Sequence, residues 1–121
     1  MAYGFWIVDI FCKNKFEGTP ATVFLIDDFL DEVLMKNLAM EINTPETIFV
    51  KELSNGDFEA VCFCPASKGM NFGNALFAAA EVIKREKSIQ KKEINIIHET
   101  KIFVVKFLDD GRIKIRFSSA K

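Results

Sequence analysis

The sequence has few of the residues that build disulfide frameworks, membrane spans or nucleic-acid sites. It has three cysteines, one histidine and a formal net charge of −1. A small, odd number of cysteines fits reduced thiols in a cytoplasm. No apolar run approaches the roughly 20 residues that span a bilayer, the start does not resemble a signal peptide, and lysines and arginines are mixed with acids. We therefore expect a cytoplasmic protein that binds neither membrane nor nucleic acid.

The common chemical motifs are also missing. The sequence contains no glycine-rich phosphate loop, no nucleophile elbow and no paired-carboxylate motif. Cys62 and Cys64 would share one face of a strand, but a metal would also need Cys12 and His98, and no zinc-type spacing links the four. We interpret the cysteines as buried structural thiols and expect no metal.

What the sequence does contain is apolar residues. Half of its 121 residues are hydrophobic, and thirteen are phenylalanine against one tryptophan and one tyrosine. This length suits one domain, covering residues 1–121, with a core that needs no disulfides. The phenylalanines indicate a dense core or an exposed apolar face that awaits a partner.

One segment, residues 71–85, has the pattern of a helix buried on every side. It carries four alanines, and its middle, residues 75–80, has no polar residue. Free N–H groups and the helix dipole at its start, near Gly73 and Asn74, can bind an anion. The alternative is that these residues simply begin the helix, with Asn71 or Asn74 as its cap, and the residues alone favour this second interpretation.

Strands dominate the rest of the chain. Two hairpin turns are predicted, at residues 54–57 and 109–111, and an amphipathic helix at residues 31–42. Because hairpins dominate, we expect an α+β fold whose mainly antiparallel sheet curls, barrel-like, around the apolar helix. The predicted strands are residues 4–11, 21–26, 48–51, 58–63, 93–98, 101–108 and 112–117.

Glu46 is the carboxylate with the most suggestive position. It lies in a predicted loop between the amphipathic helix and a strand, next to Pro45, with Ile48 and Phe49 anchoring it to the core. A carboxyl group held against an apolar wall can have a raised pKa and act as a general acid or base. The alternative, an ordinary surface glutamate, is favoured by these residues alone.

Several segments, taken in order, resemble one known family. They are V-D-I-F at residues 8–11, G-T-P-A-T-V at 18–23, E-I-N-T-P-E-T-I-F at 41–49, F-C-P at 63–65 and F-G-N-A-L-F-A-A-A at 72–80. These segments are similar to the motifs V-D-V-F, G-N-P-A-A-V, E-M-N-L-S-E-T-A-F, F-T-P and C-G-H-A-T-L-A-A-A. Those motifs belong to the N-terminal half of the PhzF-like isomerases of phenazine biosynthesis, relatives of diaminopimelate epimerase.

The resemblance implies a fold and an activity. A full-length member contains two such halves, each a barrel-like sheet around a central helix. Glu46 matches the family's catalytic glutamate, which moves a proton between carbons of a small carboxylate substrate without metal or organic cofactor. Gly73 and Asn74 match the pair that binds substrate at the start of the central helix.

The departures from the family pattern leave two functions open. Phe72 replaces the family's cysteine, Asn74 replaces its histidine, and the second half, which completes the active-site cleft, is absent. The chain is then either a proton-transfer isomerase completed by a second chain or a catalytically inactive half-domain repurposed for binding. An isolated half exposes the apolar face that met its other half. We therefore expect a homodimer, or a complex with a separately encoded C-terminal half; the substrate is not indicated.

Overall fold

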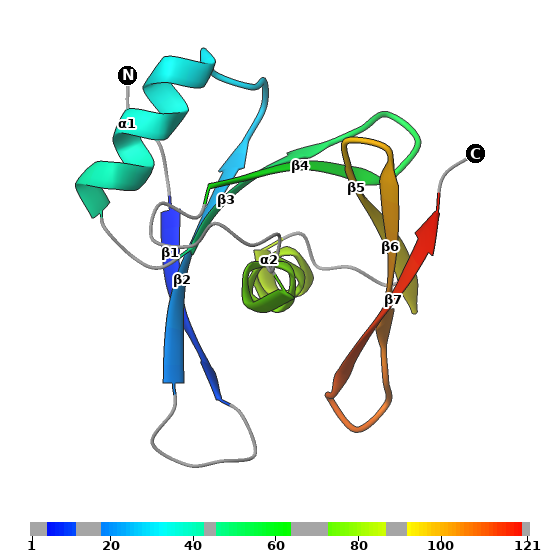
Figure 1. Cartoon of the computed structure of the whole chain (residues 1–121). Helices are drawn as coiled ribbons and strands as arrows, with labels where there is room; N and C mark the ends of the chain where they lie inside the picture. The colour runs from blue at the N-terminus through cyan, green and yellow to red at the C-terminus, as the bar shows by residue number, and fades with distance from the viewer. Residues whose placement is uncertain (1–4, 12–17, 43–45, 64–72, 87–91, 120–121) are drawn as a thin grey trace.

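The order of strands and helices follows the sequence prediction. The computed structural model describes residues 5–11, 18–42, 46–63, 73–86 and 92–119. These residues form seven strands and two helices (Figure 1). They are β1 (Phe5–Phe11), β2 (Gly18–Ile26), α1 (Glu32–Ile42), β3 (Glu46–Glu52), β4 (Phe58–Phe63), α2 (Gly73–Glu86), β5 (Glu93–His98), β6 (Lys101–Phe107) and β7 (Ile113–Ser119).

All seven strands belong to one sheet, and their order in the sheet repeats their order in the chain. Pairing is antiparallel except between β2 and β3 and between β4 and β5, which are parallel. Among the described residues the sheet is open, with β1 and β7 as its edges. It is therefore an α+β fold. Neither described helix has the length and apolarity needed to cross a membrane.

The two helices lie on opposite faces of the sheet. Each connects a parallel pair, α1 between β2 and β3 and α2 between β4 and β5. Crossovers of this kind are right-handed, and the second parallel pair runs opposite to the first. Both crossovers step across the sheet in the same direction, but the strands of the second pair point the opposite way to those of the first. Two right-handed crossovers related in this way place their helices on opposite faces of the sheet.

The face covered by α2 holds the larger core. Figure 1 shows α2 end-on, on the concave side of the curved sheet. Neighbouring strand residues alternate between faces, so Val23 and Ile48 pack on α2, while Phe24 and Phe49 face the other way. The buried α2 residues are Ala75, Leu76, Ala78, Ala79, Ala80, Val82 and Ile83.

The expectation that α2 is buried on every side is only partly met. Phe77 is 36% exposed, and Glu81 and Lys84 are half-buried. These three residues are spaced i, i+4 and i+7, so they form one stripe along the helix. The open sheet does not cover this stripe.

The opposite face holds a smaller core of aromatic rings beneath α1. Phe24 and Phe49 stack with their ring centroids 4.6 Å apart, and the Phe5 ring lies 5.3 Å from that of Phe24. Met35 of α1 packs against this stack. The helix begins at Glu32, one residue later than predicted, because Asp31 is its cap and accepts a hydrogen bond from the Val33 N–H at 3.1 Å.

Both predicted hairpin turns are confirmed. Gly56 and Gly111 have φ values of 92° and 91°, which side chains rarely adopt. In each turn the glycine N–H donates to the carbonyl of a leucine three residues earlier, Leu53 or Leu108, at 3.0 Å. Glycine is therefore required at both positions by the backbone.

A third turn is strained, and it offers a stabilising substitution. His98 pairs with Lys101, so Glu99 and Thr100 form a two-residue loop, and Glu99 has a φ of 57°. Positive φ at the first position of such a loop favours glycine. Glu99→Gly is expected to raise the free energy of unfolding by up to about 1 kcal/mol. Urea unfolding measures this change.

Thr100→Gly is the matched control for that substitution. Thr100 has no positive φ. Glycine at position 100 relieves no strain in the folded chain and increases the conformational entropy of the unfolded chain. Thr100→Gly should therefore lower the free energy of unfolding. Equal effects of the two substitutions would contradict the proposed strain at Glu99.

Candidate functional site

Glu46 lies at the start of a strand, so its predicted place in a loop is wrong. It is the first residue of β3, which begins two residues earlier than expected, and it pairs with Ala21 of β2. β2 likewise begins at Gly18 rather than at residue 21. This longer parallel pairing draws Glu46 into the sheet. Its side chain faces the α2 side, as Ile48 does, and it is only 8% exposed.

The carboxyl group of Glu46 meets the first turn of α2. The Ala75 N–H donates to Glu46 Oε1 at 2.7 Å. Ala75 is the third residue of the helix, and the first N–H groups of a helix have no acceptor within it. Glu46, 29 positions earlier in the chain, therefore supplies an acceptor for one of these free N–H groups. Of the two predicted caps, Asn71 and the side chain of Asn74 lie outside the described residues.

Two opposing effects act on the ionisation of Glu46. Burial raises its pKa above the ordinary value of 4.5, and the hydrogen bond from Ala75 lowers it; burial is the larger effect. The net result is a carboxyl group that holds its proton more tightly than an exposed glutamate does. This is the property that a general acid or base at neutral pH requires.

The raised pKa predicts how Glu46 affects stability. Well below pH 4.5 Glu46 is protonated in both the folded and the unfolded chain. As the pH rises from there through the folded pKa, the unfolded chain releases this proton first, so ionisation of Glu46 lowers the stability. Glu46→Gln, which keeps an oxygen for Ala75, should match the original chain at acid pH and exceed it in stability at pH 7. Urea unfolding between pH 4 and 8 measures this difference.

The half-buried Glu59 supplies the control for this pH series, because its neighbours Phe58 and Ala60 pack on α2 and Glu59 therefore lies on the other face of the sheet. Glu59→Gln should not reproduce the pH-dependent gain. A Glu46→Gln chain less stable than the original at pH 7 would mean that the ionised carboxylate stabilises the fold.

The other two predicted site residues begin α2. The backbone of Gly73 and Asn74 forms its first two positions, next to Ala75. The fold thus brings all three predicted site residues to one end of this helix. The side chain of Asn74 and all of Phe72 lie outside the described residues.

The described residues do not assemble a metal site. No three histidine, cysteine, aspartate or glutamate side chains gather within the described ranges. Cys62 is half-buried on the α2 face, while Cys12 and Cys64 lie outside those ranges. His98 is 7% exposed, and burial lowers its pKa, so its imidazole is neutral at pH 7.

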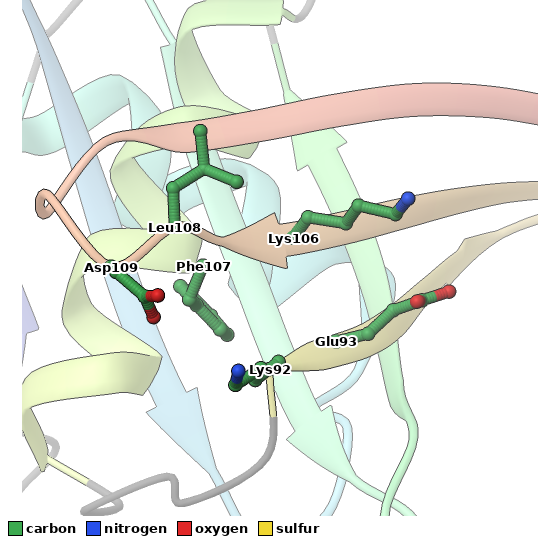
Figure 2. Close-up of a pocket in the computed structure, with 6 residues that line it drawn as sticks. All are labelled: Lys92, Glu93, Lys106, Phe107, Leu108 and Asp109. Atoms are coloured by element: carbon green, nitrogen blue, oxygen red, sulfur yellow. The ribbon is translucent and has the colours of Figure 1, made fainter.

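A shallow pocket of about 330 Å³ lies at the other end of α2 (Figure 2). The Lys84 ammonium in the last turn of α2 lies 6.0 Å from the centre of the Phe107 ring. Lys84 is nine residues, or about 14 Å, along the helix from Ala75. The sequence did not indicate this pocket, because its charged residues look like solvated strand ends. Its lining residues are Lys92, Glu93, Lys106, Phe107, Leu108 and Asp109.

Comparison with known proteins identifies the family. The model of the PhzC-PhzF family, described as phenazine biosynthesis-like protein, matches residues 8–119. The chain therefore belongs to this family, as the sequence motifs predicted. A phenazine biosynthesis-like domain-containing protein of Bos taurus is 31% identical over 118 residues, which cover 92% of this chain and 38% of the relative. An uncharacterized isomerase of Clostridium acetobutylicum is 30% identical over 129 residues, covering 97% of this chain and 42% of the relative.

A solved structure supports the same assignment. A phenazine biosynthesis protein of the PhzF family from Enterococcus faecalis superposes with a TM-score of 0.79 at 28% identity, covering 90% of this chain and 42% of that chain. The chain thus spans about two fifths of the length of the relatives it matches.

Proposed function

We propose that residues 1–121 act as the N-terminal half-domain of a PhzF-like isomerase. In this proposal the curved sheet and α2 form the family's barrel-like wrap around a central apolar helix. The reaction moves a proton on a small carboxylate substrate without metal or organic cofactor, in the cytoplasm. The observation that supports it best is the buried Glu46 carboxyl group, with its raised pKa, at the first turn of α2.

Each site residue has a distinct role in this proposal. Glu46 takes a proton from one carbon of the substrate and returns it to another. Burial raises its pKa, which brings the ionisation of this group closer to neutral pH than that of an exposed glutamate, as a group that both takes and returns a proton requires. Gly73 and Asn74 contact the substrate carboxylate at the positive end of the α2 dipole.

In this proposal a second half-domain completes the active site. Several large apolar side chains of the edge strands are exposed, including Phe5 at 47%, Ile7 at 56% and Phe117 at 56%. Exposed apolar side chains that lie together on a surface are typical of interfaces. We propose that a second copy of this chain covers it, or else a separately encoded C-terminal half, and so completes the cleft.

Solvent deuterium exchange tests the proposed reaction. The pure chain, alone and mixed with the C-terminal half of a relative, is incubated in D₂O with small unsaturated hydroxy acids and amino acids. Deuterium at a substrate carbon, lost in Glu46→Gln, supports the proposal. Sedimentation over a range of concentrations determines whether the active species is a dimer or a heterocomplex.

A second function is favoured by two departures from the family motif. The chain has Phe72 and Asn74 where the motif has cysteine and histidine. These observations support a repurposed half-domain that binds a partner but catalyses nothing. A stable complex with no deuterium exchange in any assembly would favour this function, and exchange by the pure chain would rule it out.

A further inference from the structure

We propose that two copies of this chain pair through the outer edge of β1, antiparallel and around a two-fold axis, so that their sheets join into one. The contact is separate from the proposed reaction, because it involves an edge of the sheet and no turnover. It covers Phe5 and Ile7. Phe117 belongs to the opposite edge strand and takes no part in it.

β1 has the composition of an edge strand that accepts a partner. Its inner side pairs with β2, and no strand of the described residues lies along its outer side. The backbone groups of such an edge are a template for a further strand. Asp9 is the one charged residue among the seven of β1. Phe5 and Ile7 are 47% and 56% exposed, and both lie on the α1 face of the sheet, where Phe5 contacts Phe24.

β7, the other edge strand, has the composition of an edge that resists pairing. Its exposed Lys114 and Arg116 alternate with Ile113 and Ile115, which pack on the α2 side. The two cations therefore point to the α1 face. Charged side chains on an edge strand, lysine above all, oppose the addition of further strands. The two edges of this sheet thus differ, and β1 is the one suited to a partner.

The chemistry of the two edges selects a second β1 as the partner strand. Pairing two β7 strands would bring like charges together, because each carries Lys114 and Arg116. Pairing β1 with β7 would set those cations against apolar side chains and leave a free edge at each end, so the assembly could keep growing. An antiparallel pair of β1 strands avoids both problems and closes at two subunits.

The symmetry of this pair also gathers the exposed apolar side chains. A two-fold axis perpendicular to the sheet puts the α1 faces of both subunits on the same side. Phe5 and Ile7 of the two copies then form one apolar row on that face. The outer edges of the joined sheet are the two cationic β7 strands.

The contact leaves the candidate site open. Glu46 is on β3, and β2 separates β3 from β1. Neighbouring strands are about 4.8 Å apart, so Glu46 lies about 10 Å from β1 across the sheet. Its side chain meets α2, on the face opposite to Phe5 and Ile7. The α2 side of each subunit therefore stays free for the half-domain that completes the cleft.

Sedimentation of the full chain and of two matched variants tests the contact. Ile7 and Phe117 are both 56% exposed, one on each edge strand. Ile7→Glu places like charges near the two-fold axis and should raise the dissociation constant of the dimer by about 100-fold. Phe117→Glu should leave that constant unchanged. A chain that stays monomeric at all concentrations, or a dimer that Ile7→Glu weakens no more than Phe117→Glu does, would overturn the proposal.

Amide hydrogen exchange of the original chain locates the contact without any substitution. In an edge strand, alternate N–H groups point away from the sheet and exchange readily with solvent. We expect these N–H groups of β1 to gain protection as the protein concentration rises, and those of β7 to stay unprotected. Protection gained by β7 alone, or by neither strand, would contradict the proposal, and this measurement decides if Ile7→Glu does not fold.

These outcomes separate the contact from the proposed reaction. A dimer through β1 without any deuterium exchange into substrate would support the contact and count against the isomerase. Deuterium exchange into substrate by a chain whose β1 edge stays unprotected would do the reverse.

Discussion

Replacing Glu46 with glutamine is expected to lower the rate of substrate deuterium exchange by about 10²- to 10⁴-fold in the assembled protein, the usual contribution of a general acid or base. Glutamine has nearly the same shape and retains an oxygen that can accept the Ala75 N–H. The glutamine side chain cannot take up or release a proton near neutral pH. The loss therefore reports proton transfer rather than a damaged fold, and mass spectrometry of the substrate in D₂O measures it.

Two controls make that result interpretable. Glu59→Gln changes a half-buried carboxylate on β4 and should leave the exchange rate unaltered. Glu46→Ala removes both the acid and the cap of α2, so it should lose activity and also destabilise the helix start. Full exchange by Glu46→Gln would exclude Glu46 as the proton-transferring group.

Phe24→Ala should have the largest effect on stability, lowering the free energy of unfolding by about 3 to 5 kcal/mol. The Phe24 ring is 1% exposed and lies between two others, with centroids 4.6 Å from Phe49 and 5.3 Å from Phe5. Truncation removes both ring contacts and leaves a cavity beneath α1. Urea unfolding, with the slope compared to confirm an unchanged transition, measures the loss.

Phe5→Ala tests whether the loss depends on burial. Phe5 belongs to the same row of rings but is 47% exposed, so its truncation opens no enclosed cavity. Phe5→Ala should lower the free energy of unfolding by well under half as much as Phe24→Ala does. If both substitutions lower the free energy of unfolding equally, the contribution of the rings depends on the edge strand rather than on packing beneath α1.

The order and type of the elements follow from local sequence signals. Alternating or continuous apolar runs marked the strands, and two glycine turns marked the hairpins. The parallel pairs were not predicted, because two strands joined through a helix have no local turn signal that indicates how they pair. For this reason Glu46 was predicted to lie in a loop. Residues 46 and 47 resemble turn residues in the sequence, and only their pairing with β2 shows that they belong to a strand.

For the candidate site, the sequence indicated which residues to consider but not the contacts that they make. Motif resemblance selected Glu46, Gly73 and Asn74, and the fold places them at one end of α2. The direct hydrogen bond from Ala75 to Glu46 could not be predicted, since an alanine's backbone donor has no signature in a sequence. Its partner 29 residues away is a consequence of tertiary structure alone.

The sequential order of the strands in the sheet has a consequence for synthesis on the ribosome. Each new strand emerges when its partner, the preceding strand, already exists, so the sheet can grow at one edge as translation proceeds. The longest interval between the synthesis of two successive strands separates β4 from β5, because α2 is synthesised between them. When α2 emerges, β1, β2 and β3, three of the strands that it contacts, are already available. A nascent chain that ends after α2 therefore already contains Glu46, Ala75 and the surface that brings them together.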